Sequence, residues 1–175
     1  MYSTDTASDR IVRADLDGTN YEDLICNSGC TNNDSSITFP RGIALERANG
    51  HMYWTEVLND RIVRANLDGT VHQDIICQAG CSNINVSVDG PSGIALDLAN
   101  GHMYWTNHSS QRISRANLDG TGYQDIICKS GCANNNSNLN NLLGIALDLD
   151  NGHIYFTDEF GDRIVRVNLD GTGHV

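Results

Sequence analysis

Residues 93–132 read GIALDLANGHMYWTNHSSQRISRANLDGTGYQDIICKSGC, and nearly every other residue of the 175-residue chain belongs to a copy of this stretch or to a joint between copies. The copies are spaced by 51 residues without insertion or deletion, as the positions Tyr2, Tyr53, Tyr104 and Tyr155 show. A fixed period of this size indicates that each unit is one supersecondary element, which buries its apolar faces by stacking on its neighbours. The repeat therefore predicts the architecture of the chain.

Each copy contains four strand-like runs. In the copy at 41–81 these runs are separated by Asn49-Gly50, by a polar link, and by Asp68-Gly69. Asn-Gly and Asp-Gly pairs between β-prone runs favour tight type I′ hairpins. No stretch of ten residues has a convincing helical period. We name the four strands A to D in chain order and expect each unit to be a four-stranded antiparallel sheet.

The fold class that follows is all-β, a β-propeller of four-stranded blades. A β-solenoid is the alternative, but its coils are usually shorter and lack two hairpin turns per repeat. With a period of 51, the 175 residues hold about 3.4 repeats. We expect strands B–D in 1–30, full blades in 41–81 and 92–132, and strands A–C in 142–175. The propeller is therefore incomplete, and we expect self-association or further blades to close it.

The composition excludes some classes of partner. The formal net charge is −11 and Lys129 is the single lysine, so the chain lacks the basic patch that a nucleic-acid partner requires. No apolar run is long enough to cross a bilayer, so we expect no membrane span in this segment. The arginines of the repeated Arg-Ile-x-Arg segments recur with the period, which favours a structural role for them.

The six cysteines form three pairs with the same spacing. Because the pairing has the period of the repeat, the simplest of the fifteen possible connectivities is one local disulfide per repeat. Zinc binding would need thiolates from two blades, and no histidine shares the spacing. Disulfides favour an oxidising compartment. The predicted pairs are Cys26 with Cys30, Cys77 with Cys81, and Cys128 with Cys132.

Four Asn-x-Ser sequons are candidate N-glycosylation sites if the chain is secreted from a eukaryotic cell. Three lie in the connections between strand D and the next strand A. The chance occurrence of sequons in loops rich in Asn and Ser is the competing interpretation. The four asparagines are Asn33, Asn85, Asn107 and Asn135.

One recurring segment is specific enough to indicate a family. Met-Tyr-Trp-Thr at 52–55 and 103–106 and Tyr-Phe-Thr-Asp at 155–158, with the flanking GIAL, NLDGT and QDII elements, resemble the YWTD repeats of low-density lipoprotein receptor class B propellers. Glu56 and Asn107 replace the final Asp of the motif, Ser3 replaces its Trp, and the cysteine pair is outside the usual pattern. The resemblance implies six blades, a receptor and a protein ligand.

The binding surface is predicted from the two ends of a four-stranded meander. The A–B and C–D turns share one end, where the sequence hardly varies, whereas the B–C and D–A connections share the other. Variable loops on a rigid scaffold commonly carry recognition. We therefore expect this surface to bind a protein or peptide ligand, and the net charge favours a basic one. We expect the chain to belong to an extracellular protein or to the ectodomain of a cell-surface protein. The predicted ligand-binding residues are Glu56, Val57, Leu58, His108, Glu159 and Phe160.

The sequence predicts no enzyme, no catalytic residue, no metal site and no cofactor. Asp15, Asp17 and Asp23 loosely suggest a calcium loop, but hairpin turns explain them better because the rest of an EF-hand is absent. No Gly-x-Ser-x-Gly segment occurs. Two alternatives remain open: a propeller hydrolase or lactonase whose active site is completed by missing blades, and a purely structural surface repeat.

Overall fold

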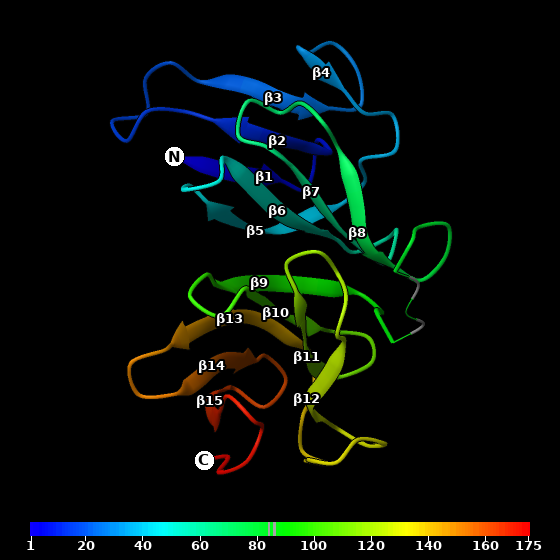
Figure 1. Ribbon diagram of the computed structural model, residues 1–175, viewed down its shortest axis with the longest axis vertical. Helices are drawn as coiled ribbons and strands as arrows, with labels where there is room; N and C mark the ends of the chain where they lie inside the picture. The colour runs from blue at the N-terminus through cyan, green and yellow to red at the C-terminus, as the bar shows by residue number, and fades with distance from the viewer. Residues whose placement is uncertain (84, 86) are drawn as a thin grey trace.

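The computed structural model describes residues 1–83, 85 and 87–175 and contains four β-sheets that follow one another along the molecule (Figure 1). The first sheet is formed by β1 (Tyr2–Asp5), β2 (Arg10–Arg13), β3 (Glu22–Cys26) and β4 (Asn32–Asn33); the second by β5 (Pro40–Glu46), β6 (His51–Glu56), β7 (Arg61–Asn66) and β8 (Gln73–Cys77); the third by β9 (Pro91–Asp97), β10 (His102–Asn107), β11 (Arg112–Asn117) and β12 (Gln124–Cys128); the fourth by β13 (Leu142–Asp148), β14 (His153–Asp158) and β15 (Arg163–Asn168).

Within each sheet the strands pair in chain order, and every hairpin pair is antiparallel. The strands A are β5, β9 and β13, and they lie beside one another, β9 between the other two. This arrangement confirms the predicted all-β fold of four-stranded antiparallel units. The described residues contain no helix that could span a membrane.

The A–B turns differ from the predicted type I′ geometry. The loop between β5 and β6 has four residues, and the N–H of Gly50 donates to the carbonyl of Arg47 (3.3 Å). Gly50 has a φ of +74°, whereas Asn49 is not among the residues with positive φ. The type I′ prediction was therefore wrong: the loop is built around a type I turn that ends in a left-handed glycine. In the next sheet the carboxylate of Asp97 stabilises this loop by accepting from the N–H of Asn100 (3.1 Å).

Strand β4 was not predicted from the sequence. It pairs in parallel with the end of β3, Ile25 opposite Asn32 and Cys26 opposite Asn33. The same return of the chain occurs in the third sheet, where Cys128 forms a parallel bridge with Asn135. It covers the backbone groups at the outer edge of strand D, because the carbonyl of Cys26 accepts from the N–H of Asp34 (2.8 Å).

The three predicted disulfides are present: Cys26–Cys30, Cys77–Cys81 and Cys128–Cys132, each with a Cα–Cα distance of 6.1 Å. Each one closes the short loop between strand D and the returning chain. The first cysteine of each pair is buried, and the second is half-buried. The disulfide thus fixes the loop at the outer edge of its sheet.

The apolar core lies between the sheets. Three clusters of buried side chains fill the three junctions, and each cluster draws on two adjacent sheets. At the junction of the second and third sheets, Tyr53 and Ile62 from one side pack with Trp105 from the other. The tryptophans of the repeated motif, Trp54 and Trp105, are fully buried. No sheet has a core of its own, which is the physical reason for the repeat.

A hydroxyl group joins each sheet to the next strand A. Thr55 Oγ1 accepts from the N–H of Gly42 in its own sheet (2.9 Å) and donates to the carbonyl of Ser92 in the next (2.6 Å). Thr106 repeats this arrangement with the N–H of Gly93 and the carbonyl of Leu143. Glycine is required beside this contact, since a Cβ on Gly93 would lie 2.5 Å from the carbonyl oxygen of Leu143.

We predict that Gly93→Ala destabilises the protein by about 1–3 kcal/mol, because the added methyl group would push β9 away from β13. Gly144→Ala is the matched control: it occupies the same place in β13, where a Cβ would meet nothing closer than Thr157 Oγ1 at 3.5 Å. Chemical denaturation of both variants measures the difference. Equal stability of the two would show that the sheets approach each other less closely.

Removing one disulfide tests how much it contributes to the free energy of unfolding. For a loop this short the chain-entropy relation gives about 2 kcal/mol, so we expect Cys77→Ala/Cys81→Ala to lower the free energy of unfolding by about that amount. The protein should show no free thiol under denaturing, non-reducing conditions. Titration of all six cysteines as free thiols would contradict the pairing.

Candidate functional site

Five of the six predicted ligand-binding residues lie in three B–C connections, and Glu56 is the last residue of β6, directly before one of them. These connections are at equivalent places in the repeat and at one end of the sheets. The D–A connections come to the same end: the N–H of Val57 donates to the carbonyl of Phe39 (3.3 Å), His108 to Gly90 (2.9 Å), and Glu159 to Asn141 (3.1 Å). The structure thus brings both kinds of variable loop together, as the meander predicts.

The predicted residues divide into exposed and buried ones. Leu58 and Phe160 occupy equivalent loop tips and are 66% and 69% exposed. Glu159 is exposed, and His108 is half-buried with its Nδ1 3.0 Å from Ser109 Oγ. Val57 is buried and Glu56 is completely buried. The prediction that Glu56 and Val57 form part of a binding surface was therefore wrong.

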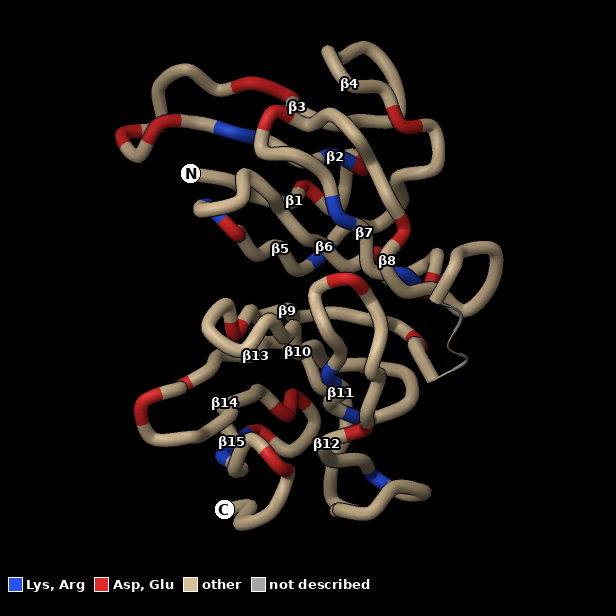
Figure 2. The backbone as a smooth tube through the Cα atoms, in the orientation of Figure 1, with Lys and Arg blue, Asp and Glu red and all other residues tan. Residues whose placement is uncertain are grey.

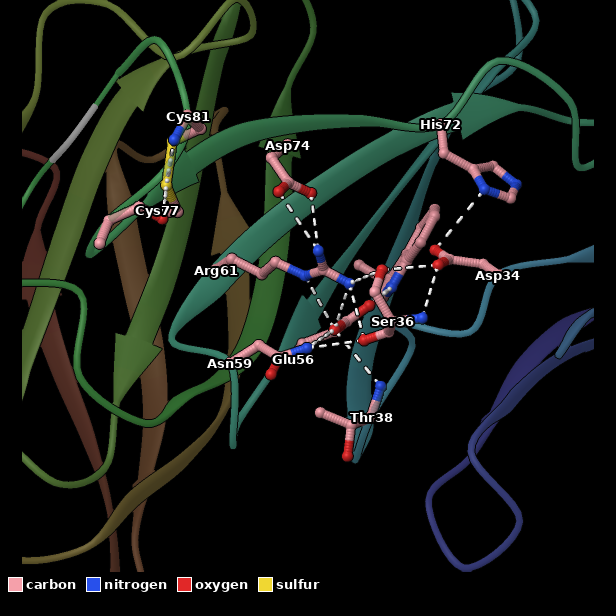
Figure 3. Close-up of polar contacts among 12 residues, drawn as sticks. Asp34, Ser36, Thr38, Glu56, Asn59, Arg61, His72, Asp74, Cys77 and Cys81 are labelled. Atoms are coloured by element: carbon pink, nitrogen blue, oxygen red, sulfur yellow. Dashed lines mark hydrogen bonds and ion pairs between the residues drawn. A yellow bond between two sulfur atoms is a disulfide. The ribbon is translucent and has the colours of Figure 1, made fainter. Parts of the chain in front are cut away.

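Glu56 is buried, and its carboxylate holds the loops in place through hydrogen bonds (Figure 3). Its carboxylate accepts from Trp54 Nε1 (3.0 Å), from the N–H of Thr38 in the incoming D–A connection (3.4 Å) and from Arg61 Nε (2.9 Å). Burial raises the pKa of Glu56, although the guanidinium of Arg61 opposes the shift. Arg61 also pairs with Asp74 (3.1 Å), which agrees with the structural role predicted for the repeated arginines.

The same position recurs in the other sheets. Asp158 is fully buried and accepts from Arg163 Nε (3.1 Å) and from the N–H of Asn140 (3.1 Å). In the third sheet the residue is Asn107, which accepts from Trp105 Nε1 (3.1 Å) but offers no carboxylate. Arg112 Nε consequently lies buried without a hydrogen-bond partner among the residues that the structure describes. In the second, third and fourth sheets the last residue of the repeated motif is therefore a buried anchor for the B–C and D–A loops.

The burial of Asn107 also corrects one glycosylation prediction. Its side chain is inaccessible, and Nδ2, the atom that would carry a glycan, donates to Ser114 Oγ (3.0 Å). A glycan at Asn107 is incompatible with this fold. Asn33 and Asn135 are exposed, Asn85 is half-buried, and glycosylation at these three sites stays a prediction.

One exposed residue at this end was missed by the sequence reasoning. Phe39 lies in the first complete D–A connection, has a φ of +50° and is partly exposed next to the Val57–Leu58 loop. Its N–H donates to Asp9 Oδ1 (2.6 Å), which fixes the backbone there. An aromatic residue directly before Pro40 in a loop rich in Asn and Ser was the available signal.

Acidic residues lie close to the exposed apolar residues along the chain: Asp60 follows Leu58 by two positions, and Glu159 directly precedes Phe160. Figure 2 marks Asp and Glu positions in loops and turns over much of the backbone. At the loop end Asp60 Oδ1 accepts from the N–H of Gly90 (2.7 Å), and Glu159 accepts from Asn141 Nδ2. The described residues include no group of three or more His, Cys, Asp and Glu placed to hold a metal ion.

We predict that Asn107→Asp raises the free energy of unfolding by about 1 kcal/mol, since the carboxylate would give Arg112 Nε the partner that the equivalent arginines have. Ser28→Asp, which adds the same charge on an exposed disulfide loop, should change stability by no more than about 0.5 kcal/mol. Urea denaturation at neutral pH compares the two. A loss of stability in Asn107→Asp would contradict the role of this anchor.

Comparisons with known proteins agree with the geometry. A family model for the low-density lipoprotein receptor repeat class B matches residues 101–149. The low-density lipoprotein receptor-related protein 1 of Pyricularia oryzae is 26% identical over 163 residues, 88% of this chain and 48% of that protein. The low-density lipoprotein receptor-related protein 5-like protein of Homo sapiens is 29% identical over 173 residues, 98% of this chain and 59% of that protein.

Solved structures show the same fold. A chain of a nidogen/laminin complex aligns with 99% of this chain and 58% of its own length, at a TM-score of 0.77 and 24% identity. A streptogramin B lyase aligns with 99% of this chain and 50% of its own length, at a TM-score of 0.66 and 19% identity. At such identities the likeness concerns the fold alone. This chain spans only about half to three fifths of these proteins. The 51-residue period, the stacked sheets and the comparisons together show that the chain is folded as blades of an open β-propeller and is similar to proteins with low-density lipoprotein receptor class B repeats.

Proposed function

We propose that the chain is an extracellular, non-catalytic module of receptor type that binds a protein or peptide at its loop end. The binding surface consists of Phe39, Leu58, His108, Glu159 and Phe160. The observation that carries the proposal is the exposure of Leu58 and Phe160 at equivalent loop tips, where solvent-facing apolar side chains stand on loops fixed by buried anchors. Recognition is commonly placed on such loops.

The chemistry of this surface favours a partner with apolar and basic side chains. Leu58 and Phe160 offer apolar area, and Glu159 adds an exposed carboxylate. The net charge of −11 attracts a basic partner over longer distances and makes association depend on salt. The loops are already ordered by Glu56, Asp158 and their arginines, so binding would cost little ordering entropy.

The comparisons support the receptor-type proposal. The relatives are named low-density lipoprotein receptor-related proteins, and one chain of the same fold comes from a nidogen/laminin complex. Three disulfides favour an oxidising compartment such as the cell exterior. These features together favour protein recognition over catalysis.

A displayed library of random peptides, selected against the immobilised chain, tests the proposal. We expect the selected peptides to carry Lys or Arg beside aliphatic or aromatic residues. Leu58→Ser/Phe160→Ser should weaken their binding at least tenfold, because the apolar anchors are lost. Raising the salt concentration should weaken binding to the unmodified chain.

The matched control is Leu16→Ser/Val71→Ser, which removes two exposed apolar side chains from C–D turns at the opposite end. It should leave binding unchanged. If the library yields no saturable binder, or if both double variants weaken binding equally, the loop end is not the recognition surface.

A further inference from the structure

The disulfide loop of the second sheet places a hydrogen-bond donor at the sulfur of its inner cysteine. The N–H of Cys81 donates to Cys77 Sγ (3.1 Å), as Figure 3 shows. The carbonyl oxygen of Ala79 lies 3.0 Å from the same sulfur. An N–H donor stabilises a thiolate, and a carbonyl oxygen accepts the hydrogen of a thiol. Both neighbours therefore favour the reduced form of the Cys77 sulfur.

The third loop directs the corresponding N–H to another acceptor. Cys132 donates it to Asn135 Oδ1 (3.2 Å), and this oxygen lies 3.4 Å from Cys128 Sγ. The partial negative charge of the oxygen opposes a thiolate at that sulfur. The first loop repeats the arrangement, since the N–H of Cys30 donates to Asn33 Oδ1 (3.2 Å). The second disulfide thus differs from the other two in the surroundings of its inner sulfur.

The exposure of the two cysteines decides which sulfur a reductant attacks. Cys77 is only 2% exposed, whereas Cys81 is half-buried. A thiolate from solution therefore reaches the sulfur of Cys81, and Cys77 becomes the leaving group. Thiol–disulfide exchange is faster when the leaving thiolate is more stable. The N–H at Cys77 Sγ consequently favours exchange at this disulfide.

The residue after Cys77 connects this disulfide to the loop end. The N–H of Gln78 donates to the carbonyl of Asp60, the last residue of the B–C loop (3.1 Å). Gln78 Nε2 donates to the carbonyl of Val88 in the D–A connection (3.0 Å). Asp60 Oδ1 in turn accepts from the N–H of Gly90 (2.7 Å). The disulfide loop therefore holds both variable loops of the second sheet through one glutamine.

We propose that Cys77–Cys81 is a thiol-exchange site, which a dithiol reductant opens before the other two disulfides, and that its opening loosens the loop end around Gln78. A thiolate of the reductant bonds to Cys81 Sγ, the Cys77–Cys81 bond breaks, and Cys77 Sγ leaves as a thiolate and takes up a proton. The second thiol of the reductant then attacks the reductant's own sulfur in the mixed disulfide and releases Cys81 as a thiol. The protein disulfide gains two electrons and two protons, and the dithiol is oxidised to a disulfide. This inference is independent of ligand binding at the loop end.

Timed reduction tests the order of opening. The whole chain is treated with dithiothreitol, quenched with iodoacetamide at intervals, digested and analysed by mass spectrometry. We expect alkylated Cys77 and Cys81 to appear about tenfold faster than the other cysteines, because their exchange has the more stable leaving thiolate.

Two variants of the third loop locate the cause. Asn135→Ile introduces the residue that the second repeat has at the equivalent place in the sequence, Ile84. It should speed opening of the third disulfide about tenfold, because the N–H of Cys132 is released to bind the inner sulfur. Ser130→Ala is the matched control: it introduces the equivalent of Ala79 but keeps the amide oxygen, so the third disulfide should open as slowly as in the unmodified chain. Both changed positions are exposed, and circular dichroism checks that the fold is preserved.

Hydrogen exchange tests the link to the loop end. After selective opening and alkylation, the amides of Gln78 and Gly90 should exchange at least about fivefold faster, since their acceptors are no longer held in place. The equivalent amides of Lys129 and Asn141 in the third sheet should be unchanged. The double alanine variant of the second cysteine pair, which lacks both the bond and the label, should show the same pattern.

Equal rates for the three disulfides, or earlier opening of the first or the third, would overturn the exchange site. An unchanged rate in Asn135→Ile, or a faster one in Ser130→Ala, would overturn the role of the N–H at the inner sulfur. Unchanged hydrogen exchange at Gln78 and Gly90 would overturn the link between the disulfide and the loop end.

Discussion

The threonine hydroxyl between adjacent sheets is the interaction on which the rest of the structure depends. Strand A has hydrogen-bonded ladder partners on one side only, so its other backbone groups need partners from elsewhere. Thr55 and Thr106 satisfy a glycine N–H in one sheet and a carbonyl in the next with a single side-chain oxygen. The contact works only if both strands keep their spacing and register.

Much of the fold could be predicted from the sequence because its determinants are periodic. Strands, disulfides and the two unlike ends follow from the 51-residue spacing, since every copy confirms the others. Glu56 was misassigned because a polar residue at the end of a strand, next to a variable loop, resembles a solvent-exposed one. Its real signal is a relation between residues: a tryptophan two positions earlier and an arginine five positions later, to which its carboxylate binds. Such pairings depend on which side chains meet in space, and a composition pattern does not contain that information.

The buried anchors connect the core to the recognition end. A carboxylate at the end of strand B satisfies the indole of its own sheet, an arginine of strand C and a backbone N–H of the incoming loop. Loop sequence can then vary at the tips, as at Leu58, Ser109 and Phe160, while the path of the backbone stays the same. The third sheet departs from this rule, because Asn107 satisfies the indole and leaves a guanidinium nitrogen unpaired.

The returning chain at the outer edge of each complete sheet has a consequence for association. Strand D would otherwise present unpaired backbone groups on which strands of other molecules could add. In the first three sheets the chain after the disulfide takes up part of this edge, with the N–H groups of Asp34, Asn85 and Asn136 bound to the carbonyls of Cys26, Cys77 and Cys128. The outer edges of these three sheets are thus protected against lateral, amyloid-like addition of strands from other molecules.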